Sequence, residues 1–237
     1  MSAVRTFFLF CALSLLVAVK AENEPINLTL FYETLCPDTR KFVLDELVLT
    51  YKSALQSKLI LKLVPFGNAK FVADGNGHTN VECQHGKEEC YGNRVQACFI
   101  VKYSPTISQS LDYVKCMFEK EDWKSTSNTS VKCANELSLN WTVIKQCTDS
   151  DEGEKLIEVF GNQTQSLVPK VNWIPWITIN GQHDDKMRFE ALFGLKTYLC
   201  SNHFNNQTLD ACKSGSAKAV FSFVVLALVM TTRLFLW

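Results

Sequence analysis

The sequence predicts an α/β fold, on the strength of three segments in its first quarter. An alternating, β-prone run at 26–32 is followed directly by a helical pattern that extends from Asp38 to about Gln56. A second β-prone run lies at 59–64. A strand, a helix and a strand in this order normally form a βαβ unit whose strands are parallel neighbours. The first strand and its helix meet at Cys36.

The next part of the chain is rich in cysteine and poor in strand signals. A loop or hairpin is expected at 68–80, and helices are expected at 95–103 and 110–118. We interpret the segment at about 68–148 as a helical insertion held together by disulfides. A separate disulfide-rich domain is the alternative, and it is less favoured because the βαβ unit needs later elements to complete its sheet.

Three later segments supply those elements. The amphipathic run at 152–160 predicts a helix. The segment at 173–182 predicts a turn, a strand and a hairpin turn, with Asn180-Gly181 as the turn signal. A final helix is expected at 189–200, and the whole domain is placed at 22–213.

Both ends of the chain have the composition of targeting or membrane segments. The stretch 1–21 has a positive start, an apolar core and a small-x-small cleavage site, so it predicts a signal peptide. The stretch 214–237 begins with small residues and continues as an apolar run. It predicts membrane attachment, either as a lipid-anchor signal or as a single transmembrane helix with Arg233 near its cytoplasmic end.

Composition agrees with export and argues against a nucleic-acid partner. Lys plus Arg and Asp plus Glu are equal at 24 each, so the chain lacks the positive charge that binds phosphate backbones. Export favours a glycoprotein of the secretory pathway that is extracellular, on the cell surface or lysosomal. Glycosylation sequons are present at Asn27, Asn128, Asn140, Asn162 and Asn206.

The cysteine count singles out one thiol. The chain has ten cysteines, and Cys11 would leave with the signal peptide. Cys36 stands apart at the strand-to-helix junction, where backbone N–H groups and the helix dipole favour a thiolate. An odd cysteine in an exported protein is an intermolecular partner or a reactive thiol, and the position favours the reactive thiol. Eight cysteines then remain for four structural disulfides: Cys83, Cys90, Cys98, Cys116, Cys133, Cys147, Cys200 and Cys212.

A sixteen-residue motif identifies a family resemblance. The segment 83–98 reads C-Q-H-G, two residues, E-C, two residues, N, four residues and C, which resembles the signature of gamma-interferon-inducible lysosomal thiol reductases. The stretches 32–37 and 174–181 resemble the family's active-site approach and its proline-containing strand. The resemblance covers roughly 26–212. Its signature positions here are Cys83, Gln84, His85, Gly86, Glu89, Cys90, Asn93 and Cys98.

The resemblance implies a thioredoxin-like fold with a disulfide-rich helical insertion and disulfide reduction at low pH. By resemblance, Cys36 is the attacking cysteine and Pro175 is the cis-proline that faces it. The chain departs from the family at Thr39, because the family carries Cys-x-x-Cys where this chain has Cys36-Pro37-Asp38-Thr39. Thr39 cannot resolve a mixed disulfide, although its hydroxyl can donate a hydrogen bond to the Cys36 thiolate and lower its pKa.

These observations predict a thiol–disulfide oxidoreductase that acts on disulfide-containing proteins through Cys36 alone. An external thiol such as glutathione would complete turnover, and no bound cofactor and no metal are expected. A zinc site at Cys83, His85, Cys90 and Cys98 is the less favoured reading of those ligand types, since disulfides are commoner in exported proteins. The alternative function is a catalytically impaired, membrane-tethered glycoprotein that binds partners or traps them as mixed disulfides.

Overall fold

The computed structural model describes residues 24–73, 79–204 and 210–213. The predicted signal peptide at 1–21 and the apolar segment at 214–237 lie outside the described residues, so both stay predictions. Within the described ranges, no helix has the length and apolarity that crossing a bilayer requires.

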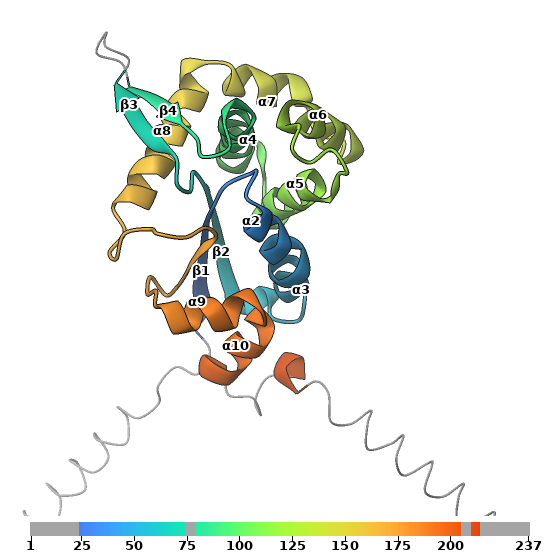
Figure 1. Cartoon of the computed structure of the whole chain (residues 1–237). Helices are drawn as coiled ribbons and strands as arrows, with labels where there is room; N and C mark the ends of the chain where they lie inside the picture. The colour runs from blue at the N-terminus through green and yellow to red at the C-terminus, as the bar shows by residue number, and fades with distance from the viewer. Residues whose placement is uncertain (1–23, 74–78, 205–209, 214–237) are drawn as a thin grey trace, which may run out of the picture.

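A three-stranded sheet forms the centre of the molecule (Figure 1). Its strand order is β2-β1-β5, formed by Leu59–Pro65, Ile26–Tyr32 and Trp176–Ile179 respectively. Strands β1 and β2 are parallel, and β5 pairs antiparallel with β1. The predicted βαβ opening is therefore confirmed, with the sequence's first strand in the middle of the sheet.

The helix of this βαβ unit follows Cys36 directly. It starts as α2 (Pro37–Phe42), passes through a π-helical turn (Val43–Leu47) and ends as α3 (Val48–Tyr51). The helix was predicted to reach about Gln56. The predicted helix is too long, because the backbone leaves the helical conformation at Lys52. A short 3-10 turn then leads into β2.

A hairpin and four helices lie between β2 and α8 (Figure 1). The hairpin consists of β3 (Lys70–Ala73) and β4 (Thr79–Glu82), in the segment where a loop or hairpin was expected. A π-helical turn, Phe99–Tyr103, extends the first of the four helices. These helices are α4 (Lys87–Cys98), α5 (Ile107–Glu119), α6 (Thr126–Glu136) and α7 (Trp141–Thr148).

Four disulfides hold the insertion and the C-terminal part of the domain. One joins the end of β4 to α4, one joins α4 to α7, one joins α5 to α6, and one joins α10 to the chain that follows it. Because cross-links restrict the unfolded chain, each typically stabilises a fold by about 2–4 kcal/mol. The pairs are Cys83–Cys90, Cys98–Cys147, Cys116–Cys133 and Cys200–Cys212.

The C-terminal part consists of α8 (Asp151–Gln165), β5, α9 (Asp185–Leu192) and α10 (Leu195–Asn202). The single helix expected at 189–200 is wrong, because Gly194 adopts an extended backbone between α9 and α10. The carboxylate of Glu46 accepts the Leu195 N–H at 2.9 Å and so caps the new helix start. The predicted turn at Asn180 and Gly181 is present, with positive φ at both residues. Directly after the turn, Gln182 pairs with Ile179 in an isolated antiparallel β-bridge.

Two apolar clusters cover the two faces of the sheet. Leu28 and Leu30 of β1 pack in one cluster with Phe42 and Leu47 of the helix that follows Cys36. Phe31 points to the other face, where it joins a cluster that includes Phe160 of α8 and residues of β2 and α4. Full burial of side chains of this size contributes about 1.5–3 kcal/mol each. The insertion thus shares a core with the sheet, and the second cluster also contains Cys36.

Candidate active site

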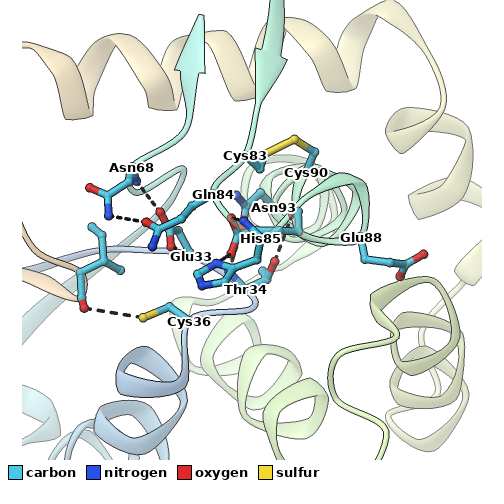
Figure 2. Close-up of polar contacts among 12 residues, drawn as sticks. Glu33, Thr34, Cys36, Asn68, Cys83, Gln84, His85, Glu88, Cys90 and Asn93 are labelled. Carbon is cyan, nitrogen blue, oxygen red and sulfur yellow. Dashed lines mark hydrogen bonds and ion pairs between the residues drawn. A yellow bond between two sulfur atoms is a disulfide. The ribbon is translucent and has the colours of Figure 1, made fainter.

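Cys36 occupies the junction between β1 and α2. It is the N-cap residue of α2, with an extended backbone (φ −75°, ψ 121°), and its residue surface is only 8% exposed. Among the described residues it is the free cysteine, since the others form disulfides. Its thiol donates to the carbonyl oxygen of Ile174 at 3.6 Å (Figure 2). The Ile174–Pro175 peptide bond is cis, as is Val168–Pro169, which the sequence reasoning did not single out.

The surroundings of Cys36 act on its pKa in opposite directions. Burial raises the pKa of the thiol, and this is the largest effect. The N–H groups of Asp38 and Thr39 lower it, as does the Thr39 hydroxyl, while the charge of Glu33 raises it again. The net pKa lies above the ordinary value. The N–H groups at the helix start favour the thiolate, as expected, but burial outweighs them.

Thr39 lies where a Cys-x-x-Cys site has its second cysteine. It is fully buried in the first turn of α2, and within the described part of the chain its Oγ1 makes no well-formed hydrogen bond. The Thr39 hydroxyl lowers the Cys36 pKa because it can donate a hydrogen bond to the deprotonated thiol. Thr39 is thus placed to stabilise the thiolate without being able to attack a sulfur.

The signature motif encodes the start of α4 and the loop before it. Gly86 is the N-cap of α4 with φ 83°, a left-handed conformation that favours glycine. Glu89 is fully buried, and its Oε1 accepts the His85 main-chain N–H at 3.0 Å. Its Oε2 lies 2.6 Å from His85 Nδ1. The Cys83–Cys90 disulfide closes the same loop, so the imidazole is held by a carboxylate and a covalent cross-link.

A second buried carboxylate, Glu33, completes this cluster, and the sequence reasoning missed it. Glu33 Oε1 accepts the Asn68 N–H at 2.5 Å. Its Oε2 is 3.5 Å from His85 Nδ1 and, among the described residues, has no hydrogen-bond partner. Burial and the nearby charge of Glu89 raise the pKa of Glu33 to about 7. A charged residue directly after a buried strand and three before Cys36 was the available signal.

The remaining signature residues connect the Cys36 loop to α4. Asn93 is fully buried, and its Oδ1 accepts the Thr34 N–H at 3.0 Å. The Thr34 hydroxyl donates to the Glu89 carbonyl oxygen at 3.1 Å. Gln84 Oε1 accepts from the Asn68 side chain at 2.7 Å. The motif therefore braces the loop before Cys36 from the insertion side (Figure 2), whereas Cys98 lies deeper in α4 and pairs with Cys147.

One group of side chains has the composition of a cation site. Glu33, His85 and Glu89 each offer a ligand atom, and these atoms lie within 4.8 Å of one another. The alternative zinc reading is wrong, because its three cysteines are consumed by disulfides. The expectation that the protein holds no metal is untested and stays a prediction.

Four of the five glycosylation sequons lie among the described residues. Each of the four that the structure describes presents an exposed asparagine, as glycosylation requires. Asn206 lies outside the described residues. Glycosylation itself stays a prediction at Asn27, Asn128, Asn140 and Asn162.

A thiol at the first strand–helix junction of such an α/β domain, facing a cis-proline loop, defines the class of thioredoxin-like thiol–disulfide oxidoreductases. The DsbA of Chlamydia trachomatis has the same fold, with a TM-score of 0.55 and 14% sequence identity over 78% of this chain and 90% of that one. The predicted thioredoxin-like fold is confirmed.

Comparison with known sequences identifies the family. The family model described as gamma interferon inducible lysosomal thiol reductase matches residues 27–137. A gamma-interferon-inducible lysosomal thiol reductase-like protein of Anopheles gambiae is 31% identical, over 90% of this chain and 92% of the relative. The corresponding reductase of Carassius auratus is 31% identical, over 86% and 79%. The chain belongs to the gamma-interferon-inducible lysosomal thiol reductase family.

Proposed function

We propose that this protein exchanges or reduces protein disulfides through Cys36 as its single redox cysteine, with an external thiol completing each cycle. The observation that carries the proposal is the combination of a free Cys36 thiol at the start of α2 with a buried Thr39 at the position of the second cysteine. Family membership supports the oxidoreductase class. The one-cysteine cycle is the specific feature of this chain.

The first step is attack of the Cys36 thiolate on a substrate disulfide. A new sulfur–sulfur bond forms between Cys36 and one substrate cysteine, the substrate disulfide breaks, and the other substrate sulfur leaves as a thiolate that takes up a proton. The proton released from the Cys36 thiol goes to solvent or to a nearby base. The substrate is then held covalently on the enzyme.

An external thiol must complete the cycle because Thr39 is redox-inert. A thiolate such as that of glutathione attacks the mixed disulfide, frees the Cys36 thiolate and leaves with the substrate sulfur as a disulfide. A second molecule of the external thiol attacks that disulfide, which releases the reduced substrate and the oxidised form of the thiol. Two external thiols are oxidised for each disulfide reduced, and no bound cofactor takes part.

The protonation of Glu33 and the charge of Cys36 influence each other. Its carboxylate raises the pKa of the thiol, and its own pKa is about 7. Two negative charges at neighbouring buried sites disfavour each other, so formation of the Cys36 thiolate favours a protonated Glu33. His85, held by Glu89, lies beside Glu33, with its Nδ1 3.5 Å from Glu33 Oε2. We assign Glu33 a proton-holding role and His85 a positioning role.

The proposed setting is the secretory pathway. Four disulfides and exposed sequon asparagines suit an oxidising compartment. A relative from Mus musculus is named a gamma-interferon-inducible lysosomal thiol reductase, which supports a lysosomal setting. Membrane attachment through 214–237 remains part of the proposal, since that segment is outside the described residues.

The test is turnover of a denatured, disulfide-containing protein with excess glutathione at acidic and neutral pH. Wild type, Cys36→Ser and Thr39→Cys are assayed side by side. We expect activity in wild type that Cys36→Ser abolishes, and Thr39→Cys should depend less on the glutathione concentration. Activity in Thr39→Cys alone would contradict the proposal and favour the alternative of a protein that binds or traps its partners.

A further inference from the structure

An apolar groove lies beside the Cys36 site and has no role in the chemistry described so far. Its volume is about 300 Å³. It is formed by α2, by the segment before β5 and by the second half of α9 with the residue after it. The lining residues are Asp38, Lys41, Phe42, Trp173, Arg188, Phe189, Leu192 and Phe193.

Exposed aromatic rings gather in this groove. Trp173, Phe189 and Phe193 are 50%, 65% and 64% exposed, and they are the exposed Phe and Trp residues of the chain's described part. The rings of Phe189 and Phe193 pack against each other, with centroids 5.2 Å apart. Single exposed apolar residues are common, whereas aromatic rings clustered in a hollow indicate a binding surface.

Two lining residues of the groove are close in sequence to the reactive thiol or to the group that it contacts. Asp38 lies two residues after Cys36, and Trp173 lies directly before Ile174, whose carbonyl oxygen accepts from the Cys36 thiol. A polypeptide whose sulfur reaches Cys36 would therefore lie near the groove close to its reacting cysteine. This continuity identifies the occupant as part of the substrate chain.

The polar rim of the groove has mixed charge. Asp38 contributes a carboxylate, while Lys41 and Arg188 contribute cations. Arg188 lies 5.9 Å from the Trp173 ring and 3.1 Å from Asp185, so it orients the indole while its charge is paired. Lys41 is paired as well, with Asp45 at 2.7 Å, and the floor is apolar. The groove therefore suits an uncharged, apolar side chain rather than an ionic group.

The burial of Cys36 adds a constraint on the substrate. With only 8% of its surface exposed, Cys36 is shielded from disulfides that a folded domain keeps inside. An unfolded or extended segment can bring its disulfide to the thiol, and such segments expose apolar side chains that folded proteins bury. The shape of the site and the nature of the groove thus point to the same substrate class.

We propose that the groove formed by Trp173, Phe189 and Phe193 binds an aromatic or large aliphatic side chain of an extended polypeptide, close in sequence to the disulfide that Cys36 attacks. This inference rests on the proposed function and names its substrate class. Burial of one ring of this kind corresponds to about a tenfold or greater gain in affinity.

The test compares two cysteine peptides that differ by Phe or Ala two residues from the cysteine, each activated as a mixed disulfide. Hydroxyethyl disulfide serves as the small reference. Transfer to Cys36 is followed by mass spectrometry for wild type and for Phe189→Ser/Phe193→Ser. Val159→Ser is the control, because Val159 is also about half exposed but lies on α8. Binding of the same peptides without the activating group to Cys36→Ser is measured by fluorescence anisotropy.

We expect wild type and Val159→Ser to prefer the Phe peptide by about tenfold and the double variant to lose most of that preference. Reaction with hydroxyethyl disulfide but equal rates for both peptides would overturn the groove proposal alone. Failure with every disulfide would overturn the proposed function, and the anisotropy measurement would still test the groove. Two other results would assign the groove to another occupant and overturn the proposal. One is wild-type self-association in analytical ultracentrifugation that the double variant loses. The other is peptide binding that appears only after removal of 214–237.

Discussion

The Cys36 thiol donates a hydrogen bond of 3.6 Å to the carbonyl oxygen of Ile174. A thiolate cannot make this contact, because a carbonyl oxygen is only an acceptor. Burial raises the pKa of the Cys36 thiol, and the contact with Ile174 also requires the protonated form. The resting site therefore holds a buried, protonated thiol, and the reactivity of Cys36 depends on the groups that lower its pKa.

Thr39 is one of those groups, so Thr39→Val should make Cys36 less reactive. Valine keeps the shape of threonine but removes the hydroxyl that lowers the Cys36 pKa. Alkylation by iodoacetamide across a pH series should show a midpoint above that of an ordinary cysteine in wild type and a still higher midpoint in Thr39→Val. Thr50→Val, at another buried threonine on α3, is the control. Coincident profiles for wild type and Thr39→Val would show that the hydroxyl does not act on the thiol.

Glu33 should make the fold more stable at acidic than at neutral pH. Its folded pKa is about 7 against an ordinary value of 4.5, so the folded state holds the proton more tightly than the unfolded chain does. Stability from this group is complete below the unfolded pKa and is lost as pH rises through about 7. The size of the effect is about 3 kcal/mol.

Thermal unfolding between about pH 5 and pH 8 measures this effect. Glu33→Gln imitates the protonated carboxyl, so its Tm should fall less with pH than the wild-type Tm. Glu158→Gln, at an exposed glutamate on α8, should follow wild type. Parallel curves for Glu33→Gln and wild type would mean that Glu33 titrates normally.

Gly67 should be far less tolerant of substitution than Gly181. Both have positive φ, at 62° and 76°, so alanine costs about 1–2 kcal/mol at either position. A Cβ at Gly67 would lie 2.2 Å from Glu33 Cγ, whereas a Cβ at Gly181 meets nothing within 4 Å. Urea unfolding should show a larger loss for Gly67→Ala than for Gly181→Ala. Equal losses would show that Glu33 moves aside freely.

Asn93 should stabilise the loop that presents Cys36. Its Oδ1 is the acceptor for the buried Thr34 N–H, and an unsatisfied buried donor costs about 1–3 kcal/mol. Asn93→Ala should lose stability of that order in urea unfolding and should expose Cys36 to faster alkylation. Asn135→Ala, at an exposed position on α6, serves as the reference. An Asn93→Ala protein with wild-type stability and alkylation rate would contradict this role.

The sequence was sufficient for the parts of the fold that depend on local pattern. Alternation at β1 and β2 and the helical spacing after Cys36 predicted the βαβ unit, and the even number of other cysteines predicted that Cys36 is free. The division of the last helix at Gly194 was not predicted, because the cap that starts α10 comes from Glu46, far away in the sequence.

The site was predicted less completely, because its chemistry depends on contacts between distant segments. The sequence identified Cys36, Thr39 and the signature motif. It gave no reason to join Glu33 to His85, since their contact requires β1 and the α4 loop to meet in the folded domain. The sequence also could not show that burial outweighs the effect of the helix N-terminus on the Cys36 pKa, because burial is a tertiary property.

The most direct test is mass spectrometry of the protein after it is mixed with a peptide whose single cysteine is activated as a mixed disulfide, so that the attached peptide carries no second thiol. The spectra are recorded without an external thiol and then with glutathione. We predict one peptide attached through Cys36, stable until glutathione is added and then fully released. Release of the peptide without glutathione, or no attachment to Cys36 at all, would contradict a one-cysteine cycle completed by an external thiol.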